Sequence, residues 1–240
     1  RRPFLASCLG GGVAATTCSA ESEQGRRHPR EDWRAAWLEM LGPFPESAPP
    51  LAPEMAPHEE IEPGIECRHV SFQSEADDRV TAYLLLPECA RPGPSPAVIC
   101  PHSTTGGSGK DRIAGLAGSK PGDPPDAPAE SRAYGRELAR WGYTTLCIDL
   151  PGDGERVPPG LPPYNTTAFY KKHPDWSIMG KIVWDVMRSV DYLHTCEWVD
   201  RERIGCLGHS LGGHTALFAA AFEPRLAAAV SNGGMLSWVR

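Results

Sequence analysis

The pentapeptide Gly-His-Ser-Leu-Gly at residues 208–212 has the residue types and spacing of a nucleophilic serine. Residues 203–207 before it are short and apolar, as in a strand, and residues 211–222 are rich in alanine and leucine, as in a helix. A turn sharp enough to join the two leaves no room for side chains two positions either side of the serine, so glycine suits both places. We therefore expect Ser210 to be the nucleophile of a serine hydrolase; a glycine-rich turn without chemistry is the alternative.

Acyl transfer by such a serine also needs hydrogen-bond donors for the negative charge that develops on the carbonyl oxygen. A helix beginning at Leu211 directs its free backbone N–H groups and its positive dipole end at the site, so the N–H of Leu211 is the first donor expected. His209 and His214 are close to Ser210 in sequence. Because a base must approach from a different loop, we interpret both histidines as packing or polar-network residues.

The elements that must position this serine follow an α/β pattern. Residues 67–73 and 80–87 predict an antiparallel hairpin at the edge of a sheet. From residue 97 onward the pattern alternates strand, loop and helix, which predicts a parallel sheet with helices on both faces. The expected strands are 97–100, 144–150, 203–207 and 226–230, and the expected helices are 131–141, 178–193 and 211–222.

Two long loops, 104–130 and 151–174, leave the carboxyl ends of predicted parallel strands. Ligands bind at those ends in open α/β sheets, so we expect both loops to wall the substrate pocket. Solvent-exposed spacers are the alternative.

Composition limits the class of protein. The chain has 240 residues, of which 40% are hydrophobic and 22% are charged, which suits one α/β domain. Its net charge of −6 gives no reason to expect nucleic acid or an anionic membrane as a partner. No segment approaches 18 uninterrupted apolar residues, so no membrane span is expected. A small-molecule or carbohydrate substrate fits better, and the oligomeric state is left open.

The N-terminal region differs from the rest. Residues 1–20 begin Arg-Arg-Pro-Phe-Leu and continue weakly apolar, which resembles a twin-arginine export signal and predicts a periplasmic or extracellular protein. An ordinary disordered terminus on a cytoplasmic protein is the alternative. Residues 21–60 predict a proline-rich arm with a short helix near 32–41.

No cysteine spacing suggests a zinc site or a redox pair. Cysteines 100, 147 and 206 fall within predicted strands, where a buried thiol packs as an apolar residue. Cysteines 67, 89 and 196 lie nearer the ends of elements and could form a disulfide in an exported protein.

Four segments carry a resemblance to a known family. They are residues 96–102, residues 143–156, residues 185–193 with 199–204, and residues 206–216, and together they extend over roughly residues 79–234. In this order they resemble the α/β-hydrolase superfamily, in particular dienelactone hydrolase-like and acetyl xylan esterase-like proteins, a branch related to the prolyl oligopeptidase catalytic domain. The resemblance implies that residues 61–240 form an α/β-hydrolase domain: a mostly parallel sheet flanked by helices, with an N-terminal antiparallel hairpin and the last strands missing.

The resemblance also assigns residues after the expected strand at 97–100. His102 stands where these families keep a His-Gly pair, and Ser103 replaces the glycine. The second oxyanion donor is then the backbone N–H of Ser103, with Thr104 as the alternative, and His102 holds the loop.

Charged residues elsewhere in the similar segments have structural interpretations. We expect an internal salt bridge within the turn after the expected strand at 144–150. Asp185 is expected to bond either locally or to the loop of the nucleophile strand. The residues of the turn are Asp149, Asp153, Glu155 and Arg156.

In this superfamily the acid and the histidine of the triad follow the serine in sequence. After Ser210 the chain offers only His214 and Glu223, within or just after the same predicted helix. We therefore expect the triad acid and histidine to lie beyond Arg240, and the 240 residues alone to be an inactive or nearly inactive fragment.

The expected activity is hydrolysis of carboxylic esters through an acyl-enzyme, with esters of carbohydrates as plausible substrates and no metal or organic cofactor implied. A prolyl oligopeptidase-type serine peptidase is one alternative, although the roughly 60 residues before the domain are too few for the propeller of those enzymes. A hydrolase fold kept as a non-catalytic binding module is the other, if Arg240 is the true terminus.

Overall fold

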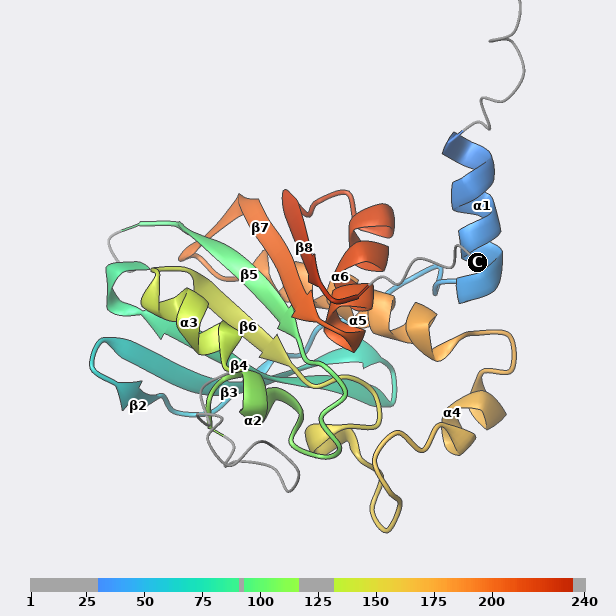
Figure 1. The fold of residues 1–240 in the computed structure, drawn as a ribbon, viewed down its shortest axis with the longest axis horizontal. Coiled ribbons are helices and arrows are strands. Elements are labelled where there is room, and N and C mark those ends of the chain that lie inside the picture. Colours follow the sequence, from blue (N-terminus) through green and yellow to red (C-terminus); the bar gives the residue numbers. More distant parts are fainter. Residues whose placement is uncertain (1–29, 91–92, 117–131, 235–240) are drawn as a thin grey trace, which may run out of the picture.

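The computed structural model describes residues 30–90, 93–116 and 132–234 (Figure 1). An eight-stranded mixed sheet runs in the order β1-β3-β4-β6-β5-β7-β8, with β2 paired to β3. The strands are β1 (Glu54–Met55), β2 (Glu59–Glu62), β3 (Ile65–Glu75), β4 (Asp78–Pro87), β5 (Ser95–Pro101), β6 (Thr144–Ile148), β7 (Val199–His209) and β8 (Ala228–Asn232).

The pairing of the strands confirms the predicted fold class. β3 and β4 form the antiparallel hairpin, in which Cys67 is opposite Leu85, and β4 joins the rest of the sheet by antiparallel pairing with β6. β6, β5, β7 and β8 are parallel to one another. The predicted strand at 226–230 lies two residues later, because residues 223–227 form the turn that leaves the preceding helix.

Helices cover both faces of the sheet (Figure 1). They are α1 (Arg30–Leu41), α2 (Gly109–Ile113), α3 (Tyr134–Arg140), α4 (Thr167–Lys172), α5 (Ile178–Leu193) and α6 (Leu211–Phe222), with short 3₁₀ turns η1 (Glu88–Ala90) and η2 (Gly154–Arg156). α5 and α6 contact one face, and α2 and α3 contact the other.

Alternation along the strands builds a separate core on each face of the sheet. Leu84 faces the α5 and α6 side, and its neighbour Leu85 faces the α2 and α3 side. On the first side the ring of Phe72 stacks on Tyr192 of α5, with ring centroids 4.9 Å apart. The central strands are therefore buried on both faces, as is typical of parallel sheets covered by helices.

The helix predicted near residues 32–41 is present as α1. Its last residue, Leu41, is buried against Val183 of α5 and Phe222 of α6. The Ser177 hydroxyl donates a hydrogen bond to the Leu41 carbonyl (2.7 Å) and accepts one from the N–H of Gly180 (3.0 Å). One serine thus caps α5 and anchors the N-terminal arm to it.

The proposed export signal at residues 1–20 lies outside the described residues. The six cysteines within the described ranges are free thiols, so the disulfide considered for Cys67, Cys89 and Cys196 does not occur. None of the described helices is both long enough and apolar enough to cross a membrane.

Candidate active site

Ser210 lies on the turn between the end of β7 and the start of α6, as the sequence predicted. Its backbone has φ +53° and ψ −115°, a conformation that residues with a side chain rarely adopt. The turn is held on both sides, because the N–H of Ser210 donates to the Asn232 carbonyl (2.8 Å) and its carbonyl accepts from the N–H of His214 (2.9 Å). The surrounding structure therefore fixes a strained residue at the amino end of a twelve-residue helix.

Close backbone contacts explain the two glycines of the pentapeptide. A Cβ atom on Gly208 would lie 2.2 Å from the Gly212 carbonyl carbon. A Cβ atom on Gly212 would lie 2.1 Å from the carbonyl oxygen of Pro101 and 3.0 Å from that of His102. The first turn of α6 is thus packed directly against the end of β5, which brings Leu211 and the residues that follow His102 to the same corner of the sheet.

His102 is fully buried and has a defined tautomer. Its Nε2 accepts a hydrogen bond from the N–H of Leu150 (3.0 Å), so its Nδ1 carries the proton and donates to the carbonyl of Ser103 (2.6 Å). A neutral imidazole held in this way bridges the ends of β5 and β6 and fixes the Ser103 carbonyl, which is the loop-holding role expected for it.

Tyr134 of α3 is a neighbour of this corner that sequence reasoning did not connect with the site. Its hydroxyl donates to the Pro101 carbonyl (2.5 Å), the same carbonyl that Gly212 approaches. Burial raises the pKa of the Tyr134 phenol well above its usual value, so the group stays a donor. The only signal in the sequence was a tyrosine on the apolar face of a short helix, which predicts core packing.

The histidines and the acid near Ser210 in sequence do not complete a triad. His209 contacts the Asn232 carbonyl (3.0 Å), and His214 lies one turn into α6. Glu223 is buried and paired with Arg225 (2.5 Å). Within the described residues, the Ser210 hydroxyl makes no hydrogen bond to a histidine.

The acids of the turn after β6 have partners other than those expected. Asp149 and Glu155 both pair with the buried Lys110 of α2, at 2.7 and 2.5 Å, rather than with Arg156. Asp153 instead accepts hydrogen bonds from backbone N–H groups and hydroxyls of nearby loops.

Asp185 was expected to bond either locally or to the loop of the nucleophile strand, and the structure shows a local bond together with two more distant ones. It pairs with Lys181 one turn earlier in α5 (2.5 Å) and with Arg156 (2.8 Å), and it also accepts from the Ser74 hydroxyl. Among the residues that the structure describes, it makes no hydrogen bond or ion pair with the loop of the nucleophile strand, and Arg156 and Ser74 are partners that neither alternative named.

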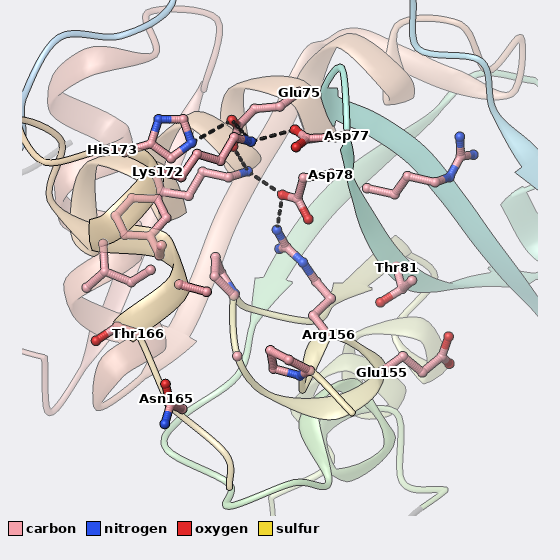
Figure 2. Close-up of a pocket in the computed structure, with 18 residues that line it drawn as sticks. Glu75, Asp77, Asp78, Thr81, Glu155, Arg156, Asn165, Thr166, Lys172 and His173 are labelled. Carbon is pink, nitrogen blue, oxygen red and sulfur yellow. Dashed lines mark hydrogen bonds and ion pairs between the residues drawn. The ribbon is translucent and has the colours of Figure 1, made fainter. Parts of the chain in front are cut away.

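A cavity of about 520 Å³ lies farther along the same edge of the sheet (Figure 2). Its walls come from the β3–β4 turn, the loop after β6, α4 and the start of α5. The lining residues are Glu75, Asp77, Asp78, Arg79, Thr81, Pro151, Gly152, Glu155, Arg156, Pro158, Asn165, Thr166, Ala168, Phe169, Lys172, His173, Ile178 and Lys181. Neither Ser210 nor Ser103 lines it, so the loop after β6 does wall a cavity, but not one that contains the serine.

Ion pairs connect the walls of this cavity to one another (Figure 2). Asp78 pairs with Arg156 (2.6 Å) and with the buried Lys181 (2.8 Å), and Glu75 pairs with Lys172 (3.0 Å). Burial raises the pKa of Asp78, but Arg156 and Lys181 outweigh this effect and lower it to about 2. We refer to Glu75, Asp78, Arg156, Lys172, Lys181 and Asp185 as the charge network.

The strand order and the helices on both faces are those of an α/β-hydrolase. Residues 169–240 match the prolyl oligopeptidase family (Peptidase_S9). The 2,6-dihydropseudooxynicotine hydrolase of Paenarthrobacter nicotinovorans is 31% identical over 191 residues, which cover 80% of this chain and 38% of that protein. YtaP of Bacillus subtilis (strain 168), named as a hydrolase, is 26% identical over 202 residues, which cover 82% of this chain and 62% of that protein.

A solved structure has the same fold. It is a protein from Bacteroides fragilis NCTC 9343 named as an acetyl xylan esterase, and it superposes with a TM-score of 0.64 at 22% identity, covering 82% of this chain and 50% of that one. The chain therefore has the α/β-hydrolase fold, and its relatives are named as hydrolases, in agreement with the resemblance inferred from the sequence. It spans less than two thirds of the length of the two relatives above, 62% and 38%.

Proposed function

We propose that this chain carries the nucleophile and the oxyanion donors of a serine hydrolase that cleaves carboxylic esters. The observation that carries the proposal is the backbone of Ser210, held at φ +53° directly before the first turn of α6. Strain of this kind persists only where the surrounding packing enforces it, and it is characteristic of functional residues. It exposes the serine hydroxyl at the carboxyl edge of the parallel strands, where α/β enzymes bind their substrates.

In the proposed reaction the Oγ of Ser210 attacks the ester carbonyl carbon while its proton passes to a histidine base. The tetrahedral intermediate then expels the alcohol, which takes the proton back from the histidine, and an acyl-enzyme remains. Water attacks the acyl group by the same sequence of proton transfers and releases the carboxylic acid. Within the described residues no histidine contacts the Ser210 hydroxyl, so the proposal leaves the base and its acid partner unassigned.

The backbone N–H of Leu211 is the first proposed oxyanion donor, because it follows Ser210 at the positive end of α6. For the second, the geometry favours Thr104 over Ser103. The Ser103 carbonyl is held by His102, whose ring also contacts Leu150 at the end of β6. Because the peptide is trans, the N–H of Thr104 points away from the Ser103 carbonyl and so away from His102, and we propose that it is directed toward Ser210.

Esters of carbohydrates are the proposed substrate class, supported by the similar structure that is named as an acetyl xylan esterase. Export from the cytoplasm is proposed from the twin-arginine-like start of the chain. Peptide-bond hydrolysis is the second candidate, because residues 169–240 match the prolyl oligopeptidase family.

The test uses the product of the complete gene alongside the 240-residue chain. We expect a fluorophosphonate probe to label Ser210, as read by mass spectrometry, and the complete product to hydrolyse p-nitrophenyl acetate. Ser210→Ala should lower turnover by roughly 10³-fold or more, because a triad without its nucleophile has no covalent route. The matched control is Ser189→Ala, since Ser189 is a buried serine whose hydroxyl donates to the Asp185 carbonyl within α5.

Turnover that survives in Ser210→Ala, or a label that maps to another serine, would overturn the proposal. Acetylated oligosaccharides and a proline-containing peptide amide, offered to the same preparations, separate the esterase from the peptidase. Faster cleavage of the peptide amide would favour the second candidate.

A further inference from the structure

Asp153 has a carboxylate that is fully buried yet supplied with hydrogen bonds chiefly from uncharged groups. The backbone N–H groups of Gly107 and Gly154 donate to its Oδ1 at 2.5 and 2.8 Å. Its Oδ2 accepts from the N–H of Thr105 (3.3 Å) and from the hydroxyls of Thr105 and Tyr164. The imidazole of His102 lies 3.8 Å away. One acidic side chain is therefore the acceptor for five donors.

These donors belong to two different loops, which meet at Asp153. Thr105 and Gly107 lie in the loop after β5, and Asp153 and Tyr164 lie in the loop after β6. Tyr164 strengthens the junction, because its hydroxyl oxygen also accepts from the N–H of Thr105 (2.7 Å). Its own backbone is held at φ +61° by a hydrogen bond from its N–H to the Gly152 carbonyl (2.7 Å). The junction is thus enforced from both sides.

The consequence for Thr104 follows from its neighbours. On one side the Ser103 carbonyl is fixed by His102, and on the other the N–H and hydroxyl of Thr105 are fixed by Asp153 and Tyr164. The backbone of Thr104, the proposed oxyanion donor, lies between these two fixed points. A donor in an oxyanion hole must be within a few tenths of an ångström of its place before the charge develops, because the site does not reorganise during the reaction.

We propose that Asp153, acting with Tyr164, is a positioning residue that aims the N–H of Thr104 at the oxyanion. This rests on the proposed function. The requirement is for an acceptor and not merely for a polar side chain, since both carboxylate oxygens receive donors. An asparagine in the same place would turn an amide N–H group toward N–H and O–H donors, and the loop would have to move.

The protonation states suit this role at neutral pH. Burial raises the pKa of Asp153, but the hydrogen bonds from Thr105 and Tyr164 outweigh it and lower the pKa below its usual value. Burial and the adjacent Asp153 raise the pKa of Tyr164 to about 12. The carboxylate therefore stays an acceptor and the phenol stays a donor.

The test compares Asp153→Asn and Tyr164→Phe in the product of the complete gene. Turnover is expressed per active site by titrating Ser210 with the fluorophosphonate probe, so that loss of folded protein does not count. We expect Asp153→Asn to lower kcat per titrated site by about 100-fold with KM changed less than about threefold, because one oxyanion donor is worth about 10²–10³ in kcat. Tyr164→Phe should lower kcat by about tenfold, because Asp153 still holds Thr105 and Gly107. Amide exchange at Thr105 and Gly107, measurable in the 240-residue chain itself, should accelerate in both variants.

The matched control is Tyr192→Phe, which removes a buried phenol hydroxyl in the core beneath Phe72, far from the two loops. Its kcat per site should equal that of the unmodified protein. A folded Asp153→Asn variant with kcat per site within threefold of the unmodified protein would overturn the inference, as would unchanged kcat in Tyr164→Phe should Asp153→Asn fail to fold. Failure of the proposed function has a different signature, namely turnover that survives in Ser210→Ala.

Discussion

The turn at residues 208–212, called here the Ser210 elbow, lies at the same edge of the sheet as the charge network. The two are built in opposite ways. The elbow is defined by backbone packed on backbone, with a strained serine at its centre. The network is defined by long charged side chains that satisfy one another across four segments of the chain. Only the network surrounds a cavity of about 520 Å³. This cavity is therefore bounded by paired charges and does not include the proposed nucleophile.

This difference in construction indicates which arrangement contributes to stability and which to reactivity. Charges that are already paired hold elements together but have little left to offer a substrate. A serine with strained backbone and no histidine partner among the described residues costs stability, and such a cost is typical of sites selected for function. We therefore expect substitutions in the network to change the free energy of unfolding, and substitutions in the elbow to change reactivity as well.

The largest effect on stability is expected from breaking the buried part of the network. Lys181 is 2% exposed and pairs with both Asp78 and Asp185. Lys181→Met should lower the free energy of unfolding by about 3–5 kcal/mol, because it leaves the buried Asp185 and the neighbouring Asp78 to share the single positive charge of Arg156. Urea denaturation of the 240-residue chain measures the loss.

Lys172→Met is the matched control for that substitution. Lys172 pairs with Glu75 and Asp77 in the same region, but its side chain is 43% exposed. Its loss should cost less than about 1 kcal/mol, as for other solvent-exposed pairs. Equal losses for the two lysines would contradict the distinction between buried and exposed parts of the network. Fluorophosphonate labelling of the molecules that remain folded should be unchanged in both.

A smaller stability loss with a larger loss of reactivity is expected at the elbow. In Gly212→Ala the new methyl group would lie 2.1 Å from the Pro101 carbonyl oxygen, so α6 must move away from the end of β5. We expect a loss of about 3 kcal/mol, at the upper end of the cost of overpacking. Labelling of Ser210 should also become slower, because the same movement displaces the N–H of Leu211.

Gly205→Ala in β7, the strand that leads into Ser210, provides the comparison. There the nearest atom to an added Cβ is the Ala228 carbonyl oxygen at 3.4 Å, an ordinary contact. We expect a change of less than about 1 kcal/mol and normal labelling, because alanine fits the space and suits a strand better than glycine does. If Gly205→Ala slowed labelling as much as Gly212→Ala, the steric account of the elbow would be wrong.

Local patterns were sufficient to predict most of the scaffold. The hairpin of β3 and β4, the parallel strands and the junction between β7 and α6 all follow from the period of apolar residues and from two glycines. These features are short-range, so the sequence carries them directly. The short helices α2 and α4, by contrast, lie in segments that are rich in glycine, proline and polar residues, and the sequence alone favoured loops there.

Long-range partners could not be predicted in the same way. Lys110 is 1% exposed between Asp149 and Glu155, although a lysine next to glycines in a loop is by default a surface residue. The expectation of a salt bridge within the turn after β6 failed for the same reason, since the cation that pairs with its acids comes from α2 and the acids that pair with Arg156 come from β4 and α5. The partners of Asp153 could not be predicted, because they are backbone N–H groups and hydroxyls of two loops, which leave no pattern in the sequence.

The smallest expected effect on the free energy of unfolding concerns Asp78, an acidic residue of the charge network. The pKa of Asp78 lies at about 2 in the folded chain, below its ordinary value of 3.8, because Arg156 and Lys181 outweigh the effect of burial. Its carboxylate therefore contributes stability that is fully present above about pH 4 and is lost as the pH falls through about 2, amounting to about 2 kcal/mol. In Asp78→Asn this contribution is absent, so the difference in unfolding free energy from the unmodified protein should shrink between pH 4 and 2.

Asp77→Asn is the neighbouring control. Its partner is the exposed Lys172 and its own side chain is 68% exposed, so the dependence of stability on acid should change little. Urea midpoints across this pH range measure both, and a difference for Asp78→Asn that stayed constant with pH would mean that the network stabilises the fold by packing and hydrogen bonding, and not through the charge of this carboxylate.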